Sequence, residues 1–279
     1  ELGILTNIIP ELEASRETSQ PPSHHWKVLE HMVQTVGQAE NIVTGKQINA
    51  GPYPKFTLKY IPSTDAHLTY FEQNYSDSQS RLTFLKLACL LHDVGKPKTK
   101  TLDPDGKTRF LGHDKVGEEI ARSILKRMKF SNSGIELVTN QISNHLRPSQ
   151  ISNQGQDPTP KAIRKYYNDT SGASIDILYL NLADYISAKG PKLTQTEWID
   201  HCRKINFIAK SESSYKRDKN QAKLVSGHDI MVGLCLNPGP FIGTLIKDVE
   251  EARLEGLVSN KKEALELIRH RINSGEYIA

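Results

Sequence analysis

Histidine and aspartate stand together in this sequence where a strongly apolar segment ends. His92 and Asp93 directly follow the run Leu82–Leu91, and Gly95 then breaks the expected helix before Lys96. Imidazole and carboxylate groups are common ligands of the divalent cations that catalyse hydrolysis. A lysine next to such a pair would supply a positive charge for a phosphate group. The segment therefore predicts a cation and a phosphate donor side by side.

Four more residues could complete a metal site. His31 lies on an early predicted helix, His113 opens the helix after a predicted hairpin, and His145 ends the next helix. Asp184 interrupts an otherwise apolar helix, where an unpaired carboxylate would be costly to bury. Each histidine alone is more often a helix cap or a surface residue, so only the whole set favours a metal site.

The elements that must position these residues are expected to be helices. Apolar residues recur at helical spacing in residues 118–128 and 175–188, and residues 82–91 are apolar on nearly all sides. Ser133 with Glu136 predicts a capped helix start. Residues 98–102 and 107–111 flank Asp103-Pro-Asp-Gly106, which is typical of a short β-hairpin. We predict an all-α fold, a helical bundle with one short hairpin. Residues 1–192 form the metal domain and residues 193–279 a C-terminal helical subdomain, which begins with a charged helix over 197–223.

Composition narrows the class of protein. The 279 residues carry a net charge of +4, and the pI is near 8.8. This balance permits a phosphate-bearing or nucleic-acid partner without requiring one. The three cysteines are far apart, which argues against a disulfide framework and predicts a reducing, cytoplasmic location. No apolar run is long enough to cross a membrane. Residue 1 is Glu, so we expect the chain to be part of a longer polypeptide.

Several motifs together resemble a known family. The order of His31, His92-Asp93 and Asp184 is similar to the pattern of the HD superfamily of metal-dependent phosphohydrolases. More narrowly, the sequence resembles the HD and C-terminal RNA-binding regions of bacterial tRNA nucleotidyltransferases and poly(A) polymerases, the CCA-adding family. The motifs that carry this resemblance are Leu2-Gly-Ile-Leu5, Ile9-Pro-Glu-Leu12, His92-Asp-Val-Gly-Lys-Pro97, Phe110-Leu-Gly-His113, His145-Leu-Arg-Pro148, Leu182-Ala-Asp184, Gly227-His-Asp-Ile-Met231 and Asn237-Pro-Gly-Pro-Phe-Ile-Gly243. The Gly-Ser and paired carboxylates of the nucleotidyltransferase domain do not occur in this sequence, so we do not expect it to add CCA by itself.

The resemblance implies a ligand set and a chemistry. One divalent cation would be held by His31, His92, Asp93 and Asp184, and a second by the bridging Asp93 with His113 and His145. The metal could be Mn, Fe, Ni, Zn or Mg. A water on such a cation loses a proton near neutral pH and can attack a phosphate ester.

Besides Asp93, two basic residues are candidates for the catalytic machinery. Lys96 and Arg147 would hold the phosphate, and their alternative interpretation is a solvated helix end. Glu30, Asp114 and Asn144 are neighbours that could orient the histidines. The other histidines, among them His24, His25 and His201, are assigned to surface or capping positions.

Three functions compete at this stage. The first is a metal-dependent phosphohydrolase acting on a nucleotide, a 2′,3′-cyclic phosphate or an RNA end. The second is a non-catalytic, tRNA-binding body of a nucleotidyltransferase-like protein, favoured by the basic stretch Lys204–Lys223 and by Pro238-Gly-Pro240. The third is an oxygen-using di-iron HD enzyme with the same six ligands. The RNA-enzyme-like tail makes the third weaker than the first.

Overall fold

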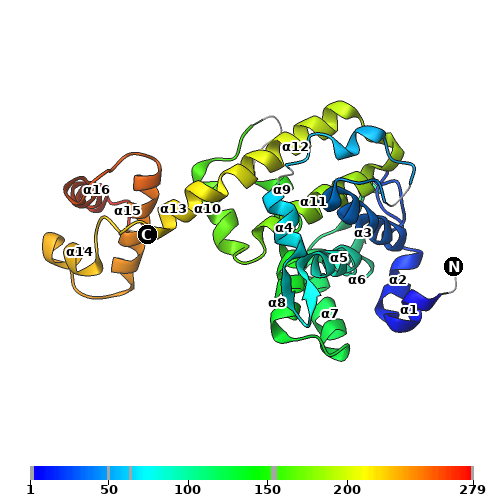
Figure 1. Ribbon diagram of the computed structural model, residues 1–279. Coiled ribbons are helices and arrows are strands. Elements are labelled where there is room, and N and C mark those ends of the chain that lie inside the picture. Colours follow the sequence, from blue (N-terminus) through cyan, green and yellow to red (C-terminus); the bar gives the residue numbers. More distant parts are fainter. Residues whose placement is uncertain (1–2, 49–50, 63–64, 152–155, 278–279) are drawn as a thin grey trace. The chain divides into compact units, whose positions relative to one another are not determined.

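The computed structural model describes residues 3–48, 51–62, 65–151 and 156–277 and confirms the all-helical prediction (Figure 1). Within these residues the strands form two small antiparallel pairs, β1 with β2 and β3 with β4. The helices are α1 (Ile4–Ile8), α2 (Glu13–Arg16), α3 (Val28–Thr44), α4 (Asp65–Glu72), α5 (Arg81–Leu91), α6 (Lys96–Thr99), α7 (His113–Arg127), α8 (Asn132–Asn144), α9 (Arg147–Gln150), α10 (Pro160–Asp169), α11 (Ser174–Lys189), α12 (Gln195–Lys210), α13 (Glu212–Asn220), α14 (Gly227–Leu234), α15 (Pro240–Leu254) and α16 (Lys261–Asn273). Short 3-10 turns span Pro10–Leu12, Lys55–Leu58 and Gly190–Lys192.

Helices α3, α5 and α11 form the centre of the bundle. Helix α3 packs against both α5 and α11, while α8 packs against α5 and against α7. Most of α11 is buried, including the continuous run Ile175–Ala183. A helix that is apolar all round must be covered on every side, and this explains its central place. In this bundle α3, α5, α7, α8 and α11 direct their ends or faces towards one interior region.

A buried ion pair ties α5 to α11. The Arg81 guanidinium donates to the Asp176 carboxylate at 2.5 Å and to the Gly172 carbonyl at 2.7 Å. The Tyr70 hydroxyl donates to the same Asp176 oxygen at 2.6 Å. Removing one partner of a buried pair leaves the other charge uncompensated, which is strongly destabilising. This pair therefore holds the bundle together at a place that no metal-site prediction includes.

The predicted hairpin is confirmed, and a second strand pair was not predicted. Strands β3 (Lys100–Leu102) and β4 (Thr108–Phe110) pair antiparallel around the expected turn. Strands β1 (Asn74–Ser76) and β2 (Gln79–Ser80) pair around Asp77 and Ser78, which have φ angles of 52° and 55°. These strands are short and lack an apolar alternation, so the sequence offered no signal for them.

Two predicted helix boundaries are wrong. The helix that leads to His145 is capped by Ser131, whose hydroxyl accepts from the Gly134 amide at 3.1 Å. The side chain of Glu136, which we expected to complete a capping box with Ser133, pairs with Arg122 instead. The charged helix expected over residues 197–223 is divided into α12 and α13 at Ser211.

Contacts divide the chain into two compact units, Glu1–Pro158 with Tyr166–Ser211 and Thr159–Lys165 with Glu212–Ala279. The smaller unit has its own apolar core, in which residues of α14, α15 and α16 pack together, among them Ile230, Leu245 and Ile268. The domain boundary proposed near residue 192 stays a prediction. Among the described residues, no helix combines the length and the hydropathy that a membrane span requires.

Candidate metal centre

Six side chains that are far apart in the sequence meet inside the larger unit. His31 comes from α3, His92 and Asp93 follow α5, His113 begins α7, His145 follows α8 and Asp184 lies in α11. Their potential ligand atoms form three groups in which all atoms lie within 4.8 Å of one another: His31, His92 and Asp93; His92, His145 and Asp184; and Asp93, His113 and His145. The structure thus brings together all six residues that the sequence singled out.

The two carboxylate oxygens of Asp93 face different histidines. Asp93 Oδ2 lies 3.3 Å from His92 Nε2 and 3.5 Å from His31 Nε2. Asp93 Oδ1 lies 3.3 Å from His113 Nε2 and 3.9 Å from His145 Nε2. Asp93 would therefore contribute one oxygen to each of the two groups of histidines if cations were bound.

Asp184 completes one of these two sides. Its Oδ1 lies 3.0 Å from His31 Nε2 and 3.6 Å from His92 Nε2. Its side chain is 19% exposed, while those of His31 and His92 are fully buried. The centre is therefore enclosed by protein but reaches solvent beside Asp184.

Backbone carbonyls orient three of the imidazoles. The Nδ1–H groups of His92, His113 and His145 each donate to the carbonyl three residues earlier, at 2.8, 2.7 and 2.7 Å. Since a carbonyl oxygen only accepts, Nδ1 of each ring carries a proton, and Nε2 is the nitrogen that faces the cluster. The neighbours Glu30 and Asn144 do not orient these rings, because their side chains bond to residues of their own helices.

The donor set fits a divalent cation. Nε2 atoms face each other at 3.2 Å between His31 and His92 and at 3.4 Å between His113 and His145. Two lone pairs at this distance repel each other unless a proton or a cation lies between them. Asp93 Oδ1 is buried and has no hydrogen-bond partner. An orphaned carboxylate oxygen inside a protein is costly, and coordination to a cation removes this cost.

The pocket requires positive charge. Burial by itself would lower the pKa of His92, but the Asp93 and Asp184 carboxylates outweigh burial and raise it to about 10. Burial would raise the pKa of Asp93 and of Asp184, but in both cases the neighbouring histidines, together with Lys96 for Asp93, hold it well below its usual range. Burial lowers the pKa of His145 to about 4. In the protein alone, a proton on His92 supplies the charge that a divalent cation would supply in its place.

A glycine allows the second side of the centre to form. A Cβ atom added at Gly95 would lie 2.2 Å from the His113 carbonyl oxygen and 2.6 Å from the Gly117 nitrogen. Because both neighbours are backbone atoms, no side-chain movement could relieve this contact. The absence of a side chain at residue 95 lets the start of α7, and with it His113, approach Asp93.

The two predicted phosphate-binding residues differ in their surroundings. The Lys96 ammonium lies 2.6 Å from Asp93 Oδ2, and its side chain is 7% exposed. It therefore belongs to the cluster. The Arg147 guanidinium pairs with Asp169 at 2.7 Å, and its side chain is 36% exposed. The Arg147 guanidinium therefore already shares its charge with a carboxylate that is not one of the six clustered residues.

Sequence reasoning missed three residues around the centre. The ring of His24 lies 5.8 Å from that of His31, edge to face, and burial followed by the charge of Lys96 lowers the pKa of His24 to about 4. The side chain of Gln20 contacts Lys96. His201 is buried and stacks on Tyr185 at 4.0 Å, so its assignment to the surface was wrong. The position of His24 just before the first ligand helix was the one available signal.

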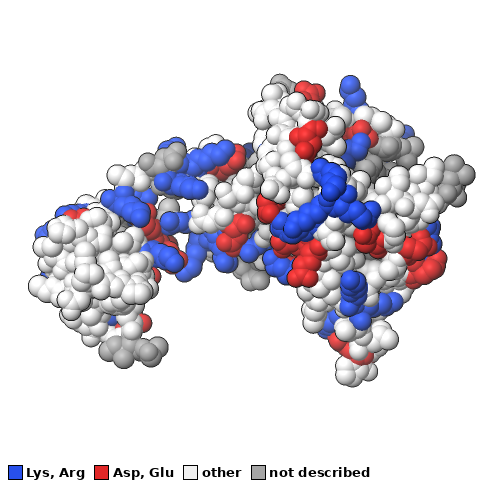
Figure 2. All heavy atoms as spheres, turned by 90° about the horizontal axis from the view of Figure 1, so that it is seen from below, with Lys and Arg blue, Asp and Glu red and all other residues white. Residues whose placement is uncertain are grey.

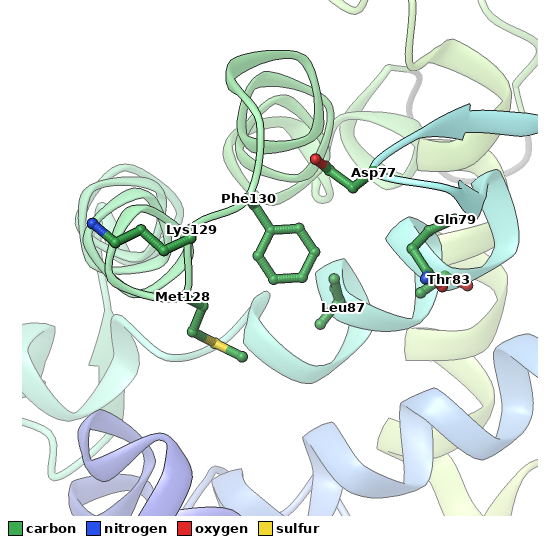
Figure 3. Close-up of a pocket in the computed structure, with 7 residues that line it drawn as sticks. All are labelled: Asp77, Gln79, Thr83, Leu87, Met128, Lys129 and Phe130. Carbon is green, nitrogen blue, oxygen red and sulfur yellow. The ribbon is translucent and has the colours of Figure 1, made fainter.

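A separate hollow of about 370 Å³ lies along α5 and is lined by none of the six residues (Figure 3). The Phe130 ring lies in the middle of the hollow and faces Leu87, and the Lys129 side chain points away from the hollow. Its lining residues are Asp77, Gln79, Thr83, Leu87, Met128, Lys129 and Phe130. With one carboxylate and no histidine or cysteine in this lining, the hollow offers no metal-binding group comparable to the buried cluster.

Comparison with known proteins supports the HD-type interpretation of this fold. Residues 64–189 match the HD domain family model. The match includes five of the six clustered residues and begins after His31.

Individual relatives are nucleotidyltransferases. The chain is 34% identical to a CC-adding tRNA nucleotidyltransferase of Thermus thermophilus over 64% of this chain and 38% of that protein. It is 28% identical to an A-adding tRNA nucleotidyltransferase of Deinococcus radiodurans over 94% of this chain and 51% of that protein. A bifunctional uridylyltransferase/uridylyl-removing enzyme of Ruegeria pomeroyi is 24% identical over 71% of this chain and 19% of its own length. The resemblance stated from the motifs is confirmed, and the chain spans about half or less of each of these relatives.

Proposed function

We propose that this chain is a divalent-metal-dependent phosphohydrolase that acts on nucleotides, 2′,3′-cyclic phosphates or RNA ends. The observation that carries the proposal is the buried cluster, in which Nε2 atoms face each other and Asp93 Oδ1 has no partner. A protein that did not bind a cation would have no physical reason to retain this costly arrangement. The metal could be Mn, Fe, Ni, Zn or Mg, with one or two ions bound. A cytoplasmic location also stays a prediction.

The residues of the centre have distinct tasks in this proposal. His31, His92, Asp93 and Asp184 would hold one cation, and Asp93, His113 and His145 would hold a second. A bound divalent cation lowers the pKa of its water towards 7 and polarises a phosphoryl oxygen. The backbone carbonyls that accept from Nδ1 keep the rings in the required tautomer.

Two basic groups receive the phosphate in this proposal. Lys96 lies beside Asp93 and offers its ammonium as a point charge to a phosphate oxygen. Arg147 would add a planar, two-pronged contact after it leaves Asp169. Both groups neutralise charge that the phosphate brings into an enclosed pocket.

Hydrolysis by the full chain tests this proposal. Protein stripped of metal and reloaded with Mn or Ni should hydrolyse bis-p-nitrophenyl phosphate or 2′,3′-cAMP, and Asp93→Asn should reduce the rate to background. Asp103→Asn is a matched control, because Asp103 lies on the exposed hairpin and pairs with Arg109. Metal-loaded protein without activity on either ester, or an active Asp93→Asn variant, would refute the enzyme.

A tRNA-binding role is the second candidate, and the names of the relatives favour it. The alignment with the A-adding enzyme extends over 94% of this chain. On the face seen in Figure 2, basic and acidic side chains are interspersed over the larger unit, so charge alone singles out no RNA surface there. Metal-free protein that binds tRNA with a steep salt dependence, and that gains no hydrolytic activity with metal, would support this role over the enzyme.

A further inference from the structure

A segment before the first long helix contacts residues of the metal centre through Gln20 and His24, and backbone hydrogen bonds fix its position. We call residues 18–27 the strap. Its first residue is tied to the start of α3, because the Val28 amide donates to the Thr18 carbonyl at 3.1 Å. Its middle is held by the His25 amide, which donates to the Ala188 carbonyl near the end of α11 at 2.7 Å. The strap therefore presents its side chains to the centre in a defined position.

Gln20 is the strap residue that contacts the predicted phosphate-binding group. Its Oε1 accepts from Lys96 Nζ at 2.7 Å, and its Nε2 donates to the Trp26 carbonyl at 3.1 Å. Ammonium can only donate and carbonyl can only accept, so the orientation of the amide is fixed by its partners. A glutamine with both ends engaged is a rigid acceptor for Lys96.

The Lys96 ammonium has three N–H groups and two acceptors in the described part of the chain. These acceptors are Asp93 Oδ2 at 2.6 Å and Gln20 Oε1 at 2.7 Å. The face of the Phe110 ring lies nearby, with Nζ 5.4 Å from its centroid. One N–H thus remains for a ligand, next to the carboxylate that would bridge the cations.

We infer that Gln20 is a positioning residue, which acts through Lys96 and fixes its third N–H for an oxygen of the substrate phosphate. This inference rests on the proposed phosphohydrolase function. A lysine has a flexible four-carbon stem and rotatable donors, so a single contact to Asp93 leaves the direction of the remaining N–H groups free. The second contact, to Gln20, defines that direction. The ligand class is a phosphate ester or inorganic phosphate.

A double-mutant cycle with orthophosphate tests the coupling between the two side chains. Calorimetry on the Mn-loaded full chain gives the dissociation constant for the wild type, Gln20→Met, Lys96→Met and the double variant. Gln20→Met keeps the length of the side chain but removes both hydrogen bonds. We expect it to weaken orthophosphate binding about tenfold, or about 1.4 kcal/mol. In the Lys96→Met background the same change should alter the dissociation constant less than about twofold.

Two further readouts separate positioning from a structural effect. Gln20→Met should keep the Mn content of the wild type and should raise KM for the ester more than it lowers kcat. Ser19→Ala is the matched control, because the Ser19 hydroxyl also accepts from a lysine, Lys100 at 2.8 Å, but on the exposed side of the strap. It should leave orthophosphate binding unchanged.

Several results would overturn the inference. They are an equal effect of Gln20→Met in both backgrounds, a loss of Mn in Gln20→Met, an equal effect of Ser19→Ala, and no binding of orthophosphate to the wild type. Hydrolysis by the wild type without coupling would refute the role of Gln20 alone. Coupling without hydrolysis would refute the proposed function and leave Gln20 as a positioning residue of a phosphate-binding site.

Discussion

The proton that His92 carries in the cation-free protein makes metal binding dependent on pH. The Asp93 and Asp184 carboxylates raise the pKa of His92 to about 10, against burial. At pH 7 roughly one molecule in a thousand then has a neutral His92. Since a metal ligand must be neutral imidazole, a cation that binds at this pH has to displace the proton.

The number of protons released when the first cation binds follows from the pKa values of the neighbouring groups. Asp93 and Asp184 have a pKa well below the usual range, so at pH 7 they have no proton to release. Burial lowers the pKa of His31, the other histidine assigned to the first cation, so this ring has no second proton to release at pH 7. We therefore expect release of about one proton from His92 when the first cation binds. The apparent affinity should fall about tenfold, or about 1.4 kcal/mol, for each unit by which pH is lowered below 10.

The raised pKa of His92 also makes the stability of the cation-free protein depend on pH. A group with a raised pKa in the folded state stabilises the fold below its unfolded value, about 6.5 for histidine, and loses this contribution as pH rises through about 10. The melting temperature of the cation-free protein should therefore fall between pH 7 and pH 10. With metal bound, His92 has no proton to lose, and this fall should disappear.

Calorimetry in two buffers of different ionisation enthalpy, at one pH, measures the number of protons released. His92→Asn is the matched variant, because its amide oxygen can still bind a cation but its side chain holds no proton in this range. Proton release should drop to near zero in this variant. A proton release near zero in the wild type at pH 7 would refute the reasoning. So would an affinity for the cation that is independent of pH between 6 and 8.

Three further variants test the parts that support the centre. Arg81→Met leaves its buried carboxylate partner uncompensated, so urea unfolding should show a free energy of unfolding about 3 kcal/mol lower, while the folded protein keeps its metal content. An unchanged free energy of unfolding would contradict the role of this ion pair. Asn181→Ala removes a hydrogen bond of 3.0 Å to the His145 carbonyl. Titration with Mn should then show an affinity for the second ion about tenfold lower than in the wild type. An equal loss of affinity for both ions would argue against a local effect. Gly95→Ala forces the start of α7, and with it His113, away from residue 95. Metal analysis should therefore show that the second ion is lost. A variant with full metal content would disprove the explanation that the missing side chain at residue 95 lets His113 approach the centre.

The local sequence predicted most elements and the ligand types because both depend on short-range patterns. The apolar runs before His92 and around Asp184 predicted α5 and α11, and the turn residues at 103–106 predicted the β3–β4 hairpin. The boundary at Ser211 was missed because the charged pattern continues across it. Polar, short strands such as β1 and β2 carry no periodic signal at all.

The residues that could bind a cation, and the helix in which or next to which each one lies, were predictable from short segments, because residue type and helical periodicity are local properties. Which of these residues meet was not predictable in this way, because it depends on long-range contacts among α3, α5, α7, α8 and α11. It brought Gln20 to Lys96, paired Arg147 with Asp169 and buried His201. A side chain's partners depend on the packing of distant segments, and no pattern within one segment contains that information.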